Sequence, residues 1–227
     1  MMTRRTIPEL PTLDTGVTLL EMEDRASGAL HSLVLDHILL ESGSAVWIDS
    51  RGNGTTQPMA ELAPSMRVLN RVHIARAFTP WQHYSLIDDI PAELPDDVEL
   101  VVLPDVDAFY RADDLGSQEA DQMLTAALRR VVRLAVDYDL PVLVTRTTDD
   151  AFSEPVADVS TTVLQCEQTA FGPRFSGDEF ETLVYPVEDG LVQTTFAFWR
   201  RVLSSRHAVF DEIETPAPME VQIGGPN

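Results

Sequence analysis

Apolar and polar residues form alternating blocks along the chain that predict strands and helices in turn. Short apolar runs have the composition of strands at residues 17–22, 45–48, 71–78, 98–105 and 140–145. The runs at 98–105 and 140–145 are apolar throughout their middle, as in strands covered on both faces. Helical spacing begins at Gly28 and again at Pro80, which suits a first helical turn. A long amphipathic helix is expected at about 117–138.

This alternation predicts the class of the fold. Strands that alternate with helices through residue 146 imply right-handed crossovers, and therefore a mostly parallel sheet with helices on both faces. After residue 146, "STTVLQCEQT", "FETLVYPV" and "LVQTTFAFW" have the composition of strands joined by glycine-containing turns. They predict an antiparallel C-terminal extension of an α/β fold. We expect an N-terminal arm at 1–15, one core domain at 16–204, and a flexible acidic and proline-rich tail at 205–227.

The charge of the chain is strongly negative. Its 37 acidic residues face 16 basic ones, for a net charge of −21, and all the basic residues are arginine. Such a surface suits either a basic partner or a salt-saturated cytoplasm, and the even spread of acidic residues favours the halophilic interpretation. At molar salt the Debye length is about 3 Å, so the charge then serves solubility.

Several kinds of site and location find no support in the sequence. No apolar run reaches 18 residues, so we expect no membrane span, and with no secretory signal we expect a cytoplasmic protein. The single cysteine, Cys166, lies in a predicted strand and is expected to be a buried structural thiol. The five histidines lack the spacing of metal ligands, so we expect no metal site.

Five stretches resemble one family when they are taken in order. They are "GVTLLEM" followed by a helix, "VWIDSRG", "VHIARAFTPWQH", "LVVLPDVDAFYR" and "PVLVTRT". Over about residues 14–200 the chain is similar to the RecA-type ATPase core. It most resembles archaeal RadA and its short paralogue RadB, with KaiC-like ATPases as cousins. The resemblance implies a RecA-like P-loop fold and a role in DNA recombination and repair.

The P-loop pattern G-x-x-x-x-G-K-[ST] falls on residues 23–30 of this chain. Gly28 matches the second glycine, but Glu23 replaces the first, Ala29 the lysine, and Leu30 the hydroxyl residue that holds magnesium. The loop chemistry needs backbone amides around phosphate, a lysine on the outer phosphates and a hydroxyl on the metal. A chain without lysine cannot supply the ammonium group in any alignment.

Three further family positions are altered. The aspartate that ends the metal-binding strand falls on Pro104, and Asp105 comes one residue late. A shift of one residue turns a strand side chain to the opposite face, although Asp105 could still reach a metal if the strand ends at the proline. The glutamate that activates water is replaced by Arg51, and the glutamine that senses the γ-phosphate by Thr147.

These losses predict a pseudo-ATPase with no catalytic residues, no bound ATP or magnesium, and a function carried by protein contacts. Removing one preorganised electrostatic group typically lowers a rate by about 10²–10³. The expected role is that of an accessory factor in recombination and repair. The alternatives are a KaiC-like regulatory module and an enzyme with unconventional nucleotide use.

The expected interaction surfaces follow from the same resemblance. The two loops that bind single-stranded DNA in the family fall on residues 112–121 and 147–160, each with four acidic residues and no arginine. Direct DNA binding there is disfavoured, because phosphate contacts supply most non-specific affinity. A protein partner, such as a recombinase or another RecA-like subunit, is instead expected at the subunit-stacking face, with the candidate contacts Arg76, Phe78, Trp81 and His83. Two arginine clusters, at 129–133 and 200–206, are expected to pair with nearby carboxylates.

Overall fold

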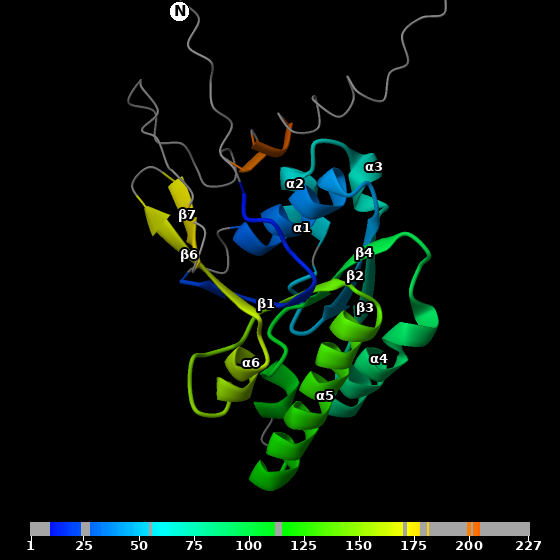
Figure 1. Ribbon diagram of the computed structural model, residues 1–227, viewed down its shortest axis with the longest axis vertical. Coiled ribbons are helices and arrows are strands. Elements are labelled where there is room, and N and C mark those ends of the chain that lie inside the picture. The colour runs from blue at the N-terminus through cyan, green and yellow to red at the C-terminus, as the bar shows by residue number, and fades with distance from the viewer. Residues whose placement is uncertain are drawn as a thin grey trace, which may run out of the picture.

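The computed structural model has one seven-stranded sheet with helices on both faces (Figure 1). It describes residues 10–23, 28–54, 56–111, 115–169, 172–177, 181, 199–200 and 202–204. The strands are β1 (Gly16–Met22), β2 (Ser44–Asp49), β3 (Val72–Arg76), β4 (Val98–Leu103), β5 (Pro141–Val144), β6 (Thr162–Thr169) and β7 (Gly172–Ser176). The helices are α1 (Ala29–Leu40), α2 (Thr56–Leu62), α3 (Met66–Leu69), α4 (Pro80–Glu93), the 3₁₀ helix η2 (Ala108–Arg111), α5 (Ser117–Asp137) and α6 (Glu154–Asp158).

The strand order is β3-β2-β4-β5-β1-β6-β7, and all neighbouring pairs are parallel except β6 with β7. The predicted α/β class, the mostly parallel sheet and the antiparallel C-terminal strand are therefore confirmed. The parallel part extends one strand further than expected, because β6 runs parallel to β1. Most of the strands expected at 180–187 and 191–199 lie outside the described residues.

Two hydrophobic layers enclose the sheet, and the strands alternate between them with a period of two. Leu20 of β1 and Leu143 of β5 face the layer of α1, α2 and α3. Their neighbours Leu19 and Val142 face the layer of α4, α5 and α6. Figure 1 shows these two groups of helices on opposite sides of the sheet. Burial on both faces explains why β5 and the second half of β4 are continuously apolar.

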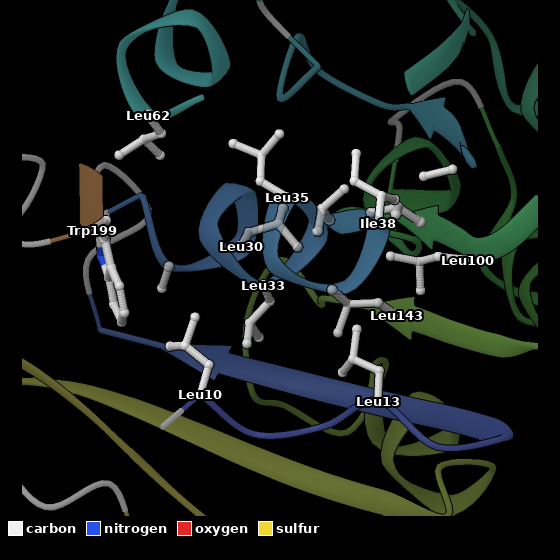
Figure 2. Close-up of a cluster of buried hydrophobic side chains, with 14 of the residues drawn as sticks. Leu10, Leu13, Leu30, Leu33, Leu35, Ile38, Leu62, Leu100, Leu143 and Trp199 are labelled. Carbon is white, nitrogen blue, oxygen red and sulfur yellow. The ribbon is translucent and has the colours of Figure 1, made fainter. Parts of the chain in front are cut away.

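Helix α1 differs from its predicted form. The sequence suggested one apolar face, whereas every residue from Ala29 to Leu39 is buried. The sheet and the short helices α2 and α3 do not cover it alone. Leu10 and Leu13, which precede β1, and Trp199, near the other end of the described chain, join the same hydrophobic cluster (Figure 2). Helix α1 therefore forms the centre of one core layer.

Helices α2, α3, η2 and α6 were not predicted, because they are too short to show a helical period. The boundaries of the longer helices agree with prediction. Helix α4 begins at Pro80, and the Oγ1 atom of Thr79 accepts a hydrogen bond of 3.2 Å from the backbone N–H of Gln82. That bond satisfies one of the free amides of the first turn. The pair Thr79 and Pro80 therefore marks the start of α4 in the sequence.

Candidate functional site

A glycine stands immediately before the first turn of α1, at the position where the sequence predicted the second glycine of a P-loop. Gly28 precedes α1 in the left-handed region, with φ 75° and ψ 7°, which favours glycine at this position. Its carbonyl oxygen accepts hydrogen bonds from the backbone N–H of Ser32 at 2.9 Å and from Ser32 Oγ at 2.8 Å. The backbone frame of the first helical turn is therefore present.

The side chains of this turn form part of the hydrophobic core. Ala29 is 0% exposed and Leu30 is 4% exposed, and both belong to the apolar cluster around α1. In Figure 2 the Leu30 side chain lies among the other core leucines. Glu23, at the end of β1, is exposed. The structure thus places two of the altered P-loop residues in the core and one on the surface.

The carboxyl ends of β2 and β4 are joined by a buried polar network. Ser50 Oγ donates to the carbonyl oxygens of Pro104 and Asp105. Asn53 Nδ2 donates to the backbone oxygen of Ser50 at 2.9 Å and to Asp105 Oδ2 at 3.0 Å. Since His31 Nε2 donates to the Asn53 carbonyl oxygen at 3.0 Å, the network also reaches α1. Polar residues at these strand ends therefore hold one another.

Asp105 lies beyond the end of its strand, which is the condition under which the sequence allowed it to reach a metal ion. Strand β4 ends at Leu103, and Asp105 has a left-handed backbone with φ 47°. Its N–H donates to Thr145 Oγ1 at 2.8 Å, and its side chain is buried beside Asn53. Within the described part of the chain, no group of three His, Cys, Asp or Glu side chains is arranged to hold a metal ion.

The two remaining altered positions lie on different loops. Arg51 is exposed in the turn after β2, with φ 63°. Thr147 follows β5, and its backbone N–H donates to Asp107 Oδ1 at 2.7 Å. Arg51 and Thr147 are thus brought to the same edge of the sheet as Asp105, because the carboxyl ends of parallel strands share one edge.

Ion pairs around Arg111, which were not predicted, hold the loop after β5. Arg111 Nε donates to Asp107 Oδ2 at 2.5 Å, and both terminal nitrogens of Arg111 donate to Asp150 at 2.8 Å. These hydrogen bonds raise the pKa of Arg111 and lower that of Asp150, and the guanidinium lies 4.8 Å from the centre of the Phe152 ring. The i,i+4 spacing of Asp107 and Arg111 was the available sequence signal.

A cleft of about 460 Å³ opens at the carboxyl ends of β1 and β5, beside the middle of β6, and we call it the acidic cleft. It is lined by residues 20–23 from β1, 145–149 from the loop after β5, and 165–167 from β6. Among the described residues of this lining, Glu21, Glu23, Asp149 and Glu167 are carboxylates and Arg146 is basic. Arg146 contacts Glu21 Oε1, and its NH2 group lies 2.8 Å from Asp149 Oδ1.

The expected partner surface is only partly exposed. Phe78 is 73% exposed and Trp81 is 52% exposed, beside the edge strand β3. Arg76 is half-exposed and donates from Nε to Asp49 Oδ2 at 2.8 Å. His83 is 0% exposed, and its Nδ1 lies 2.9 Å from the Tyr110 hydroxyl oxygen. The prediction is therefore wrong for His83, because the turn of α4 directs this side chain into the core.

The other residues singled out in the sequence have structural surroundings. Cys166 is buried, and this burial together with the nearby charge of Glu167 raises the pKa of its thiol to about 12. Arg130 pairs with Asp88 at 2.7 Å, as expected for the first arginine cluster. Most of the second cluster lies outside the described residues, although Trp199 beside it is fully buried. No described helix is long and apolar enough to cross a membrane.

Comparison with known proteins relates this chain to one family. The model of the family described as Rad51 matches residues 37–168, which is more than half of the chain. The chain is 28% identical over 114 residues to the DNA repair and recombination protein RadA of Metallosphaera sedula. That alignment covers 46% of this chain and 35% of RadA, so the chain spans about a third of the length of that relative. The chain belongs to the Rad51 family.

Proposed function

We propose that this chain is a catalytically inactive member of the Rad51 family that acts through protein contacts in DNA recombination and repair. The proposed setting in DNA recombination and repair is based on the family and on the name of the RadA relative. The accessory role comes from the residues of the site, because fold alone does not dictate activity.

One observation carries the proposal of inactivity. The positions that should present an ammonium group and a hydroxyl group to a nucleotide are occupied by Ala29 and Leu30, which are buried in the core of α1. Catalysis of phosphoryl transfer consists mostly of positioning and electrostatic stabilisation by such groups. Buried methyl groups can supply neither. The described residues therefore do not fit a magnesium-bound triphosphate.

The electrostatics of the neighbouring cleft support the same proposal. The acidic cleft has four carboxylates and one guanidinium, and Arg146 is already paired with two of those carboxylates. A triphosphate would meet like charges, which disfavour its binding. We therefore propose that the chain holds neither ATP nor magnesium.

The proposed partner surface consists of Phe78, Trp81 and the outer edge of β3. Large exposed aromatic side chains are enriched where proteins bind one another. Among the described strands β3 ends the sheet, and an edge strand can pair with an added strand through its outer backbone groups. A recombinase or another RecA-like subunit is the partner that we propose. The acidic residues of 147–160 disfavour direct DNA binding through that loop.

Two measurements test this function. Titration with a fluorescent ATP analogue and magnesium, together with a phosphate-release assay, should give no saturable binding below about 1 mM and no hydrolysis. Co-purification from the native organism should recover a RecA-family protein. Replacing Phe78 and Trp81 with alanine should abolish the recovery, whereas replacing the exposed Met66 should not. Micromolar nucleotide affinity with turnover would refute the proposed inactivity.

A further inference from the structure

We propose that the acidic cleft receives an arginine side chain of a polypeptide partner. This inference rests on the proposed function, because it states how a protein partner would be recognised. The cleft is separate from the aromatic surface at Phe78 and Trp81, since it lies across the sheet at β1, β5 and β6.

The charges of the lining leave room for one more cation. Arg146, which is 9% exposed, lies between Glu21 and Asp149 and is their ion-pair partner. Glu23 and Glu167 are exposed, and among the residues that the structure describes neither has an ion pair. Among the residues that the structure describes, the lining has a formal charge of −3, from four carboxylates and one guanidinium. A guest that brings a positive charge would relieve this excess.

The remaining lining suits the shape of arginine. The volume of about 460 Å³ lies within the range of small-ligand pockets. The half-buried side chain of Met22 supplies apolar surface that an aliphatic stem can cover. The hydroxyl group of the exposed Thr148 and the side-chain amide of the exposed Gln165 supply oxygen acceptors. A guanidinium group carries five donors in one plane and pairs with carboxylates through two parallel hydrogen bonds.

The position of the cleft agrees with a binding role. In open parallel sheets, ligands bind in the crevice outside the carboxyl ends of the strands, and this cleft lies there. A bare metal ion is a poorer guest, because no described group of acidic, histidine or cysteine side chains is arranged to hold one. A nucleotide is a poorer guest as well, because its phosphates share the charge of the lining.

The test uses the full chain and a short peptide of known composition. The probe is an acetylated and amidated Gly-Ser-Arg-Ser-Gly peptide, and its control carries citrulline, which has the shape of arginine without the charge. Amide shifts of the labelled protein are followed during titration in 0.15 M and in 1.5 M potassium chloride. High salt screens diffuse attraction to an acidic surface more than it weakens a contact inside a cleft.

We expect saturable shifts at residues 145–149 and 165–167 with the arginine peptide at both salt concentrations, and none with the citrulline peptide. The double variant Glu23→Gln/Glu167→Gln should bind about tenfold more weakly. The matched variant Glu93→Gln/Glu119→Gln removes two exposed carboxylates elsewhere and should bind within about twofold of the parent chain.

Three results would overturn the inference: equal loss of affinity in both double variants, equal binding of the citrulline peptide, or shifts spread over the surface that disappear at 1.5 M salt. The two proposals also fail separately. If the Glu23→Gln/Glu167→Gln variant recovers a RecA-family partner at the parental level, the proposed role of the cleft in partner binding is refuted and the proposed function is supported. If the cleft binds the arginine peptide saturably but no RecA-family partner is recovered, the cleft proposal is supported and the proposed function is refuted.

Discussion

Restoring the missing P-loop side chains should unfold this protein rather than create an ATPase. The perturbation is the double substitution Ala29→Lys and Leu30→Thr, which returns the ammonium and hydroxyl groups to their family positions. Ala29 is 0% exposed and Leu30 is 4% exposed, so both new polar groups would enter the core around α1.

The expected loss of stability can be estimated from burial. A lysine kept in an apolar core has its pKa lowered by about 3 units, which corresponds to about 4 kcal/mol. Replacing a buried leucine by a smaller side chain that brings an unpaired hydroxyl should remove about 2–4 kcal/mol more. The combined loss of about 6–8 kcal/mol is comparable to the whole stability of many domains, at about 5–15 kcal/mol.

Urea denaturation followed by tryptophan fluorescence measures this loss, with nucleotide binding assayed on the folded fraction. The matched control is Ala92→Lys, which places the same side chain at an exposed position of α4 and should change stability by less than about 0.5 kcal/mol. A double variant with parental stability and micromolar affinity for magnesium ATP would refute the reasoning. It would mean that the loop around Gly28 is a latent nucleotide site.

Three other predictions concern buried or paired groups. Burial lowers the pKa of His83 to about 4, so between pH 6.5 and 4 the unfolded chain binds more protons than the folded chain. The free energy of unfolding should therefore fall with pH, by about 2 kcal/mol from pH 7 to pH 5, and His83→Gln should flatten this dependence in urea titrations. Because Arg111 holds Asp150, the substitution Arg111→Ala should raise amide exchange rates at residues 148–153 at least tenfold. The control Arg133→Ala, at an exposed position, should leave these rates unchanged. Unchanged rates in Arg111→Ala would show that Arg111 does not hold the loop. The Cys166 thiol, with a pKa of about 12, should react with iodoacetamide at pH 8 at least a hundredfold more slowly in the folded than in the urea-unfolded chain.

The order of strands and helices was predictable because each long element carries its own periodicity. The continuous apolar runs of β4 and β5 indicated burial on both faces, and Thr79 with Pro80 marked the start of α4. The alternation of these elements then predicted a parallel sheet with little ambiguity. Short helices such as α2 and α6 escaped prediction, since a single helical turn or two does not display a period.

The proposed absence of nucleotide chemistry rests on the sequence, because that chemistry depends on which functional groups are present. A chain without lysine cannot place an ammonium group beside phosphate, however it folds. The burial of the P-loop positions could not be judged in the same way. The helical spacing of α1 suggested one covered face, and the covering of the other faces comes from Leu10, Leu13 and Trp199, which are distant in sequence.

Tertiary structure alone decided which polar residues meet. Asp150, in the loop after β5, meets Arg111 of η2, which is distant in sequence, and the strands that line the acidic cleft also come from separate segments. His83 follows the exposed aromatic residues Phe78 and Trp81 in sequence, yet the rotation of α4 turns it inward. Local sequence determined the elements through their periodicity, whereas contacts between elements arise from crossover connections that bring distant strand ends to one edge of the sheet.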